Sequence, residues 1–232
     1  MSTVKIHTII VAGGSGSRFG ADIPKQYCLL AKRPILIHTI EAMRHALPDA
    51  EITLVISSDM QQLWDDLCKT HDFISPTVVY GGATRAQSVA NAINSINNPD
   101  KDDIVLIHDG ARPLVDEPTV KRVVECLISQ TSDGVIPAIA LTDSIRELDD
   151  TGSHPVDRSR YRAVQTPQGF NLIALQKAYQ IPERPDWTDD ASVMATAGKT
   201  KINLVEGSPE NIKITNPLDI EIAEAIMRCR QK

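Results

Sequence analysis

The sequence predicts a three-layer α/β/α fold of the Rossmann-like type, with a mainly parallel sheet and a projecting β-arm. Short runs of β-branched and aliphatic residues alternate with segments of helical length and spacing, which predicts parallel strands covered by helices on both faces. One polar segment interrupts this alternation and predicts the arm. With 232 residues, of which 42% are hydrophobic, the chain can bury the core of a single domain spanning 1–232.

Six runs are expected to be strands, and most are continuously apolar, as strands buried on both faces are. They span 7–12, 52–57, 77–82, 104–109, 134–140 and 202–206. Helical length and spacing are found in 34–46, 59–70, 84–97 and 117–129. A last helix is expected to begin with Asn216 as its N-cap, Pro217 at its first position and Asp219 in its first turn.

The segment 144–165 is too polar for the core and lacks the apolar stripe of a helix. Its sequence DDTG (149–152) is typical of a turn between two extended stretches. We therefore expect a hairpin arm that projects from the domain.

Composition argues against several classes of protein. The formal net charge of -6 disfavours a general binder of nucleic acid or membrane surfaces, which would normally be basic. No stretch is long enough to span a bilayer, and the N-terminal apolar run leads into glycines, as a first strand does. Cys28, Cys68, Cys126 and Cys229 are far apart and form no C-x-x-C pair. This spacing disfavours a disulfide framework or a zinc site and is typical of reduced thiols in a cytoplasmic protein.

The first predicted strand leads into a glycine-rich turn at 12–20. Gly13, Gly14 and Gly16 allow backbone N–H groups to approach phosphates without obstruction by side chains. The turn is no dinucleotide fingerprint, because Phe19 stands where a glycine is needed, and it lacks the Gly-Lys-Ser/Thr ending of a P-loop. From the glycines alone, an ordinary flexible connection is an equally good interpretation.

Two cations, Arg18 and Lys25, follow on the same loop, and Pro24 stiffens the approach to Lys25. Transfer of a phosphoryl-type group depends mainly on charges placed around the reacting phosphate and its leaving group. The loop and its cations together favour a phosphate site, whereas each cation alone could be a solvated surface charge.

The motif HDGARP (108–113) follows the predicted strand 104–109. An aspartate at the carboxyl end of a parallel strand lies at the edge where such sheets bind ligands. Asp109 can hold Mg²⁺ against triphosphate oxygens, and Arg112 can bind a phosphate through two bonds. The alternative is a turn capped by Asp109 with Arg112 as its ion-pair partner. A lone histidine is a poor metal site, so His108 is interpreted as structural.

Three further clusters admit two interpretations each. The segment 81–88, with its two glycines, Arg85 and Ser88, could bind a nucleotide base or simply start a helix. The motif TDDAS (188–192) fits a capped helix start at least as well as a ligand site. Lys213, just before the last helix, would ordinarily be solvated.

The motifs AGGSGSRFG…PKQY, GGATRAQSV, HDGARP, TPQGF, TDDAS and NIKIT occur in this order from residue 12 to 215. Together they closely resemble those of the 2-C-methyl-D-erythritol 4-phosphate cytidylyltransferase family, over nearly the whole chain. The resemblance implies the nucleotidyltransferase form of the fold. It also implies transfer of CMP from CTP to 2-C-methyl-D-erythritol 4-phosphate, giving 4-diphosphocytidyl-2-C-methyl-D-erythritol and pyrophosphate, with Mg²⁺ as cofactor.

The resemblance also implies roles for particular residues. Arg18 and Lys25 match the pair that stabilises the α-phosphate in the transition state, and Lys213 matches a phosphate-binding lysine, so these three are the expected catalytic residues. The implied nucleotide-binding positions are Ala12, Gly13, Gly14, Gly16, Gly82, Ala83, Ser88 and Asp109. The implied acceptor-binding positions are Asp109, Arg112, Ser144, Arg158, Thr166 and Thr188, with Asp109 also the metal ligand.

This chain departs from the family at two of these positions. Ala83 stands where the family often has Asp, but the contact there is expected to be largely through the backbone. Ser144 stands where Thr is usual, which keeps the hydroxyl. The family's arm crosses to a second subunit, so the resemblance implies a homodimer that exchanges the arm 144–165.

No general base is needed for such a transfer. The acceptor phosphate is already ionised at neutral pH and can attack the α-phosphorus directly, so the enzyme has to hold two polyanions in line and offset their repulsion. Two other functions are compatible with parts of the sequence. A ribitol 5-phosphate cytidylyltransferase tends to have Ser-Val in place of the Gly-Ala of HDGARP and lacks the DAS ending of TDDAS. A non-catalytic nucleotide-binding module on the same fold has no need of Arg18, Lys25, Asp109 and Lys213 together.

Overall fold

The computed structural model describes residues 4–14, 23–129, 132–198 and 200–230. Within these residues, eight strands form one sheet. Its parallel half consists of β5 (Thr77–Tyr80), β4 (Glu51–Ile56), β1 (Ile6–Val11) and β6 (Ile104–Asp109), in that order across the sheet. All four strands therefore end at the same edge.

Beyond β6 the sheet becomes mixed. β11 (Gln168–Asn171) runs antiparallel between β6 and β7 (Gly134–Ala140), and β10 (Arg162–Val164) is antiparallel to the end of β7. β12 (Ile202–Glu206) is parallel to β7. Pro137, which has no N–H, lies between the β7 residues that pair with β11 and those that pair with β10, so its missing donor falls at the change of partner strand.

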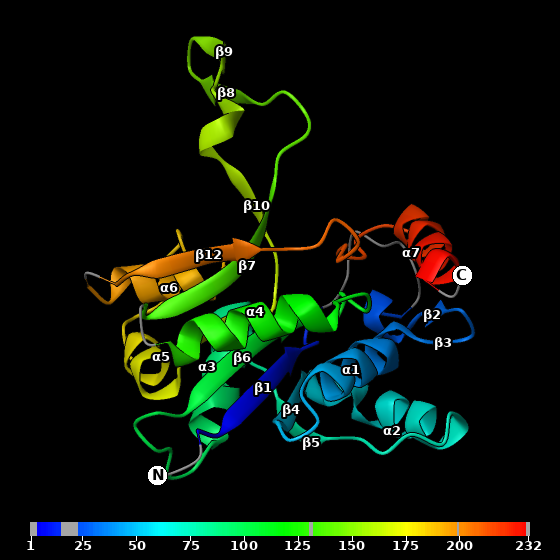
Figure 1. The fold of residues 1–232 in the computed structure, drawn as a ribbon. Helices are drawn as coiled ribbons and strands as arrows, with labels where there is room; N and C mark the ends of the chain where they lie inside the picture. Colours follow the sequence, from blue (N-terminus) through cyan, green and yellow to red (C-terminus); the bar gives the residue numbers. More distant parts are fainter. Residues whose placement is uncertain (1–3, 15–22, 130–131, 199, 231–232) are drawn as a thin grey trace.

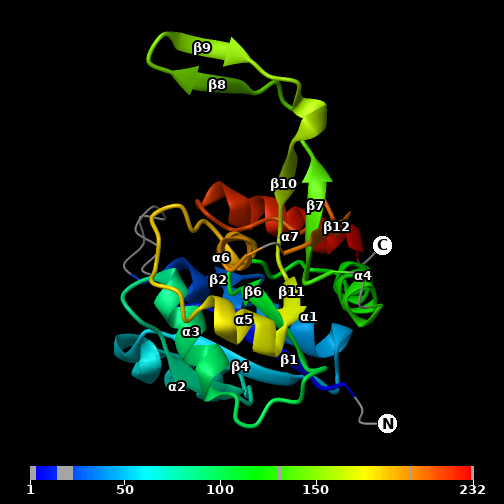
Figure 2. The same cartoon turned by 90° about the vertical axis from the view of Figure 1, so that its left-hand side faces the viewer.

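Helices cover both faces of the sheet and make the three layers (Figure 1, Figure 2). One face packs against α1 (Ile35–Ala46), α2 (Gln61–Thr70) and α4 (Glu117–Ile128). The other face packs against α3 (Arg85–Ser95), α5 (Leu172–Ala178) and α6 (Asp190–Thr196). Successive strand residues alternate between the two cores: Ile10 belongs to the first and Ile9 to the second. The prediction of a mainly parallel, doubly covered sheet is confirmed.

A smaller cluster joins the C-terminal helix to the loop after β1. α7 (Leu218–Arg230) packs through Ala223 beside the short ribbon formed by β2 (Leu29–Leu30) and β3 (Arg33–Pro34). This packing fixes the segment just before α7. The segment before α7 lies near the 3-10 helix η1 (Lys25–Tyr27), which begins with Lys25 of the predicted phosphate loop.

The six predicted strands and four predicted helices are present, with bounds that differ from expectation by at most two residues. The predicted last helix is also present: α7 begins at Leu218, and Asp219 lies in its first turn, as expected. The Asn216 carbonyl accepts the Asp219 N–H at 3.1 Å, and the Asp219 carboxylate accepts the Asn216 N–H at 2.9 Å, so Asn216 lies at the start of the helix, where its N-cap was predicted. The short elements β2, β3, β10, β11 and α5, and the 3-10 helix η2 (Ser58–Met60), were not predicted.

The polar segment forms the expected hairpin. β8 (Arg146–Asp149) pairs antiparallel with β9 (Gly152–Pro155), every residue of both strands is exposed, and the hairpin stands well away from the sheet (Figure 1, Figure 2). The Asp149 carboxylate accepts the Thr151 N–H, and Gly152 has a φ of 132°, a conformation that favours glycine. A 3-10 helix, η3 (Arg158–Arg160), returns the chain toward β10.

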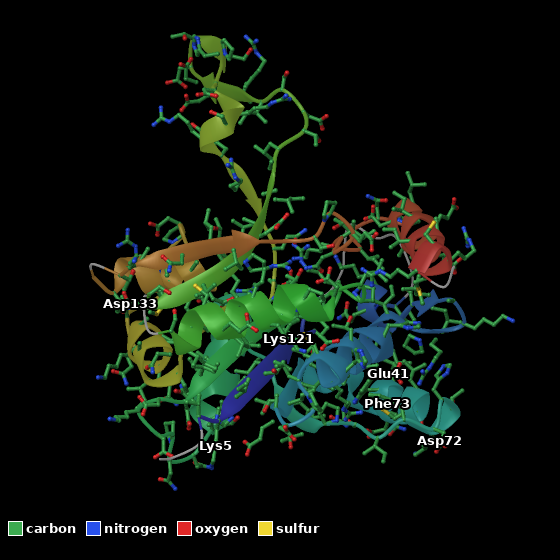
Figure 3. The ribbon with its side chains drawn as sticks, viewed as in Figure 1. Lys5, Glu41, Asp72, Phe73, Lys121 and Asp133 are labelled. Carbon is green, nitrogen blue, oxygen red and sulfur yellow. The ribbon has the colours of Figure 1, made fainter. Side chains whose placement is uncertain are left out.

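Most charged side chains lie at the periphery of the domain, as the labelled Lys5, Asp72, Lys121 and Asp133 do (Figure 3). The four cysteines form no disulfide. In the part of the chain that the structure describes, no helix is long and apolar enough to cross a membrane.

Candidate active site

A cavity of about 500 Å³ opens where β1, β5 and β6 end. The edge at which parallel strands end is where open α/β sheets bind ligands. The residues that line the cavity come from the turns after these strands, from η1 and from the segment before α7. They are Val11, Ala12, Gly13, Gly14, Lys25, Gln26, Gly82, Ala83, Thr84, Arg85, Ser88, Asp109, Gly110, Ala111, Lys213 and Thr215. Nine of the predicted site residues thus meet in one cavity.

The central charge of the cavity is Asp109, whose side chain is 12% exposed. Its Oδ2 lies 2.9 Å from Lys213 Nζ and 3.2 Å from Arg112 Nε. Burial by itself would raise the pKa of Asp109, but the positive charges of Lys213, Arg85 and Arg112 outweigh burial and hold the pKa well below its ordinary value. Asp109 is therefore a carboxylate at any physiological pH. Its ion pair with Arg112, the alternative interpretation of this motif, is present.

The neighbouring His108 is completely buried and fixes the turn that carries Asp109. Its Nε2 donates to the Arg112 carbonyl at 3.1 Å, and its Nδ1 accepts from the Thr166 hydroxyl at 2.9 Å. That hydroxyl in turn accepts the Asp109 N–H at 3.1 Å. Burial lowers the pKa of His108 to about 4, so the ring is neutral. The contacts agree with the structural interpretation of His108.

Arg112 is held against the segment that bears Lys213. Its Nη1 donates to the Asn211 carbonyl at 2.8 Å, and the fully buried Asn211 side chain donates to the Thr166 carbonyl at 2.8 Å. These bonds join three segments that are far apart in sequence. Arg112 and Thr166 therefore hold Asp109 through contacts outside the cavity and are not among the residues that line it.

The start of the glycine-rich turn is tied to η1 by Gln26, which is 4% exposed. Its side-chain amide donates to the Ala12 carbonyl at 2.6 Å and to the Gly14 carbonyl at 3.0 Å. This brings the backbone of 12–14 next to Lys25, the residue before Gln26. The sequence analysis did not identify Gln26 as a site residue, because its partners are main-chain atoms, which leave no motif in the sequence. The predicted Arg18 and Gly16 lie outside the described residues.

The segment 81–88 both starts a helix and lines the cavity. Thr84 is the N-cap of α3 and accepts the Gln87 N–H. Ser88, which is 4% exposed, accepts the Gly82 N–H at 3.1 Å and donates to the Thr84 carbonyl at 2.8 Å. The Ala83 N–H donates to the Gln87 side chain at 3.0 Å. Side chains in the first turn of α3 therefore set the conformation of 82–84.

TDDAS starts a helix, the first of our two interpretations of this motif. Asp189 is the N-cap of α6 and forms a capping box with Ser192. Asp190 is fully buried, and Arg85 Nη2 lies 2.6 Å from its Oδ2. The partners are 105 residues apart, so no local pattern could have paired them.

The remaining predicted acceptor residues are exposed and do not line the cavity. Thr188 lies at the start of α6, where its N–H donates to the Ser192 hydroxyl. Ser144 and Arg158 belong to the arm, and the Arg158 guanidinium donates to the Thr142 carbonyl. Within one chain, the arm residues are thus separate from the cavity.

The donor set suits a metal ion that arrives with a polyphosphate. Among the described residues no group of three or more His, Cys, Asp or Glu side chains could hold an ion by itself. Mg²⁺ is commonly held by one or two carboxylates together with substrate phosphates and water, and Asp109 supplies one such carboxylate. The chemistry of this site therefore fits Mg²⁺ better than Zn²⁺, which prefers a closed set of nitrogen and sulfur ligands.

Comparison with known proteins agrees with the arrangement. The sequence model of a family described as 2-C-methyl-D-erythritol 4-phosphate cytidylyltransferase matches residues 6–229. A protein of that name from Bacteroides thetaiotaomicron is 40% identical, with 97% of this chain and 100% of the relative covered.

Solved structures give the same result. The crystal structure of a 4-diphosphocytidyl-2C-methyl-D-erythritol synthase from Anaerococcus prevotii superposes with a TM-score of 0.81 at 25% identity, over 97% of this chain and 96% of that one. The Francisella tularensis 2-C-methyl-D-erythritol 4-phosphate cytidylyltransferase gives a TM-score of 0.77 at 30% identity, over 95% and 99%.

Proposed function

Because the chain belongs to the 2-C-methyl-D-erythritol 4-phosphate cytidylyltransferase family, we propose that the cavity at the ends of β1, β5 and β6 is its active site. The chain is a nucleotidyltransferase that transfers CMP from CTP to 2-C-methyl-D-erythritol 4-phosphate. One observation supports the location most strongly. Lys25, Lys213 and the backbone of 12–14 come from separate segments and line the same cavity as Asp109.

In the proposed reaction, an oxygen of the acceptor phosphate forms a bond to the α-phosphorus of CTP. The bond from that phosphorus to its bridging oxygen breaks, and the electron pair leaves with pyrophosphate. No proton has to be removed from the acceptor, so the protein's task is to hold the two anions in line and offset their charge. Lys25 and Lys213 do this from two separate segments that line the cavity, and Arg18 is the further cation expected at the α-phosphate.

Asp109 is the residue that would hold Mg²⁺, through its single carboxylate. When bound, Mg²⁺ supplies positive charge that offsets and orients the triphosphate. The low pKa of Asp109 keeps this ligand ionised. His108 and Thr166 hold the Asp109 backbone, so the carboxylate is presented at a fixed position.

We further propose that the protein is a cytoplasmic homodimer that exchanges its arms. A two-stranded ribbon alone is barely stable in water, and every residue of β8 and β9 is exposed. Leu148 is 78% exposed on the arm, and Leu204 is 54% exposed on β12. A partner subunit would cover such apolar side chains, and its site would receive Ser144 and Arg158. The four free thiols fit a reducing compartment.

The other functions compatible with the sequence have less support. The relatives that match over nearly the whole chain are named 2-C-methyl-D-erythritol 4-phosphate cytidylyltransferases, which disfavours ribitol 5-phosphate as the acceptor. A non-catalytic module does not account for the cations around Asp109.

Release of pyrophosphate tests the proposal. Purified protein is incubated with CTP and Mg²⁺, together with either 2-C-methyl-D-erythritol 4-phosphate or ribitol 5-phosphate, and with ATP in place of CTP as a control. We expect turnover only with CTP and the methylerythritol acceptor. Equal or faster turnover with ribitol 5-phosphate would reassign the acceptor, and CTP binding without any pyrophosphate would support the non-catalytic module.

A further inference from the structure

Two segments that are distant in sequence are joined beside the cavity. The loop 81–84 precedes α3, and the segment 179–190 leads into α6. Arg85 Nη2 lies 2.6 Å from Asp190 Oδ2, and the Thr84 hydroxyl donates to Glu183 Oε2 at 2.9 Å. The Thr84 contact is exposed to solvent and is weak for that reason. The Arg85 contact is different, because its acceptor has no access to water.

Asp190 is fully buried, and both of its carboxylate oxygens have a partner. Oδ2 binds Arg85, and Oδ1 accepts the Tyr179 hydroxyl at 2.6 Å. Burial of that hydroxyl and the nearby Asp190 charge raise the pKa of Tyr179 far above its usual range, so the hydroxyl stays a donor. Burying a carboxylate away from water costs free energy unless the carboxylate is paired with a cation and hydrogen-bonded. The Arg85 guanidinium is therefore held at one fixed position.

The position of Arg85 sets the position of the nucleotide loop. Arg85 is the first residue of α3, and the first turn of that helix binds the Gly82 and Ala83 N–H groups through Ser88 and Gln87. Moving Arg85 would displace the first turn of α3, and with it the part of the cavity wall that it holds. Arg85 itself lines the cavity, and its charge also acts on Asp109. Without Asp190, that cation would be drawn toward Asp109.

We propose that the Arg85–Asp190 ion pair positions the nucleotide loop 81–84 for CTP and holds the Arg85 charge at a fixed place in the cavity that it shares with Asp109. Arg85 is then a positioning residue that acts on CTP binding through the loop. This inference rests on the proposed function, because it assumes that the cavity takes CTP.

The test is to measure CTP affinity by calorimetry and steady-state kinetics in variants of the pair. Asp190→Asn and Arg85→Met each raise the CTP dissociation constant and KM by about tenfold or more, with kcat within about threefold. The CTP dissociation constant of the double variant is no higher than that of the single variant that binds CTP more weakly, because both substitutions break the same interaction. Arg85→Lys recovers part of the affinity lost in Arg85→Met. Tyr179→Phe is the matched control: it removes a bond to the same carboxylate but keeps the ion pair, so the CTP dissociation constant changes by less than about threefold.

Two results would overturn the inference. If Asp190→Asn and Arg85→Met lower the melting temperature but bind CTP as the wild type does, the pair is only a structural tie. If Arg85→Met lowers kcat while the CTP dissociation constant is unchanged, Arg85 contacts the reacting phosphate directly. Should Asp190→Asn not fold, Arg85→Met alone decides by the same two criteria. A wild-type protein that binds CTP but transfers nothing would overturn the proposed function instead, and the calorimetric comparison would still test the ion pair.

Discussion

At the scale of single residues, the cavity is organised by cations around one carboxylate. Lys213 and Arg112 both contact Asp109, while Lys25 lines the cavity from η1. An attacking phosphate and a triphosphate repel one another, so each cation that lies close to the reacting phosphorus lowers the barrier. The two cations assigned to the α-phosphate are therefore expected to affect the rate more than they affect the binding of CTP.

We predict that Lys25→Met and Arg18→Ala each reduce kcat by on the order of 10²-fold or more, with a smaller change in CTP affinity. Such a reduction is typical when one donor that stabilises transition-state charge is removed. Steady-state kinetics with both substrates varied measures the effect. A near-normal kcat combined with a raised KM for CTP would show that the residue only binds the nucleotide.

Asp109→Asn is predicted to lose activity that raised Mg²⁺ partly restores. The substitution keeps the size of the side chain but removes the charge that holds the metal, while the substrate phosphates remain as ligands. Titrating Mg²⁺ against the wild type and the variant tests this. Asp186→Asn, which neutralises an exposed carboxylate outside the cavity, is the control and should leave the half-saturating Mg²⁺ concentration unchanged. If Asp109→Asn has the same Mg²⁺ dependence as the wild type, Asp109 has only a structural role.

The sequence alone pointed to Asp109, Arg112 and Lys213 as separate binders of metal or phosphate. It offered the Asp109–Arg112 ion pair as an alternative, but it did not indicate that Lys213 contacts Asp109, because Lys213 lies far along the chain and its segment is placed by the packing of α7. Gln26 and the Arg85–Asp190 pair were missed for the same reason: their partners are backbone atoms or distant side chains.

At the scale of elements, the runs of apolar residues identified the parallel strands, but they could not identify β11. This strand is short and contains Gly169, a residue disfavoured in strands. The structure supplies the reason for the glycine. A Cβ atom at Gly169 would lie 2.5 Å from Leu127 Cδ1 and 2.8 Å from Val123 Cγ1, because α4 packs directly on the strand backbone. At this position, close packing against α4 requires a glycine, although glycine is disfavoured in strands.

Gly169→Ala is therefore predicted to lower the free energy of unfolding by roughly 1–3 kcal/mol, the usual cost of overpacking a core. Urea unfolding measures it. The double variant Gly169→Ala/Leu127→Ala removes the atom nearest to the new methyl group, so its destabilisation should be smaller than the sum of the two single variants. Simple additivity would mean that the methyl group is accommodated elsewhere.

At the scale of the whole molecule, the exposed arm predicts a shared active site. If arms are exchanged, each site combines Lys25 of one chain with Arg158 of the other, and Lys25→Met and Arg158→Ala homodimers are both nearly inactive. A mixed dimer has one site with both defects and one intact site. Unfolding and refolding equal amounts together should therefore restore about a quarter of wild-type activity, since half of randomly formed dimers are mixed.

Each protein refolded alone is the control and should stay inactive. If Arg158 acts within its own chain, every site carries one defect and mixing restores nothing. That result would exclude the shared site, and the roles of Lys25 and Asp109 would be unaffected.

The central claim is that the acceptor phosphate attacks the α-phosphorus directly, helped only by charge and position. The side chains that line the cavity agree with this. The Ser88 hydroxyl donates to the Thr84 carbonyl, and Asp109 is held by two cations, so neither is poised as a nucleophile.

The stereochemistry at phosphorus tests this claim most directly. CTP made chiral at the α-phosphorus by sulfur substitution is turned over, and the configuration of the product is determined by phosphorus NMR. A single in-line displacement inverts the configuration, which is the result we predict. Retention would require two displacements through a nucleotide covalently bound to the protein, and would contradict direct attack by the acceptor.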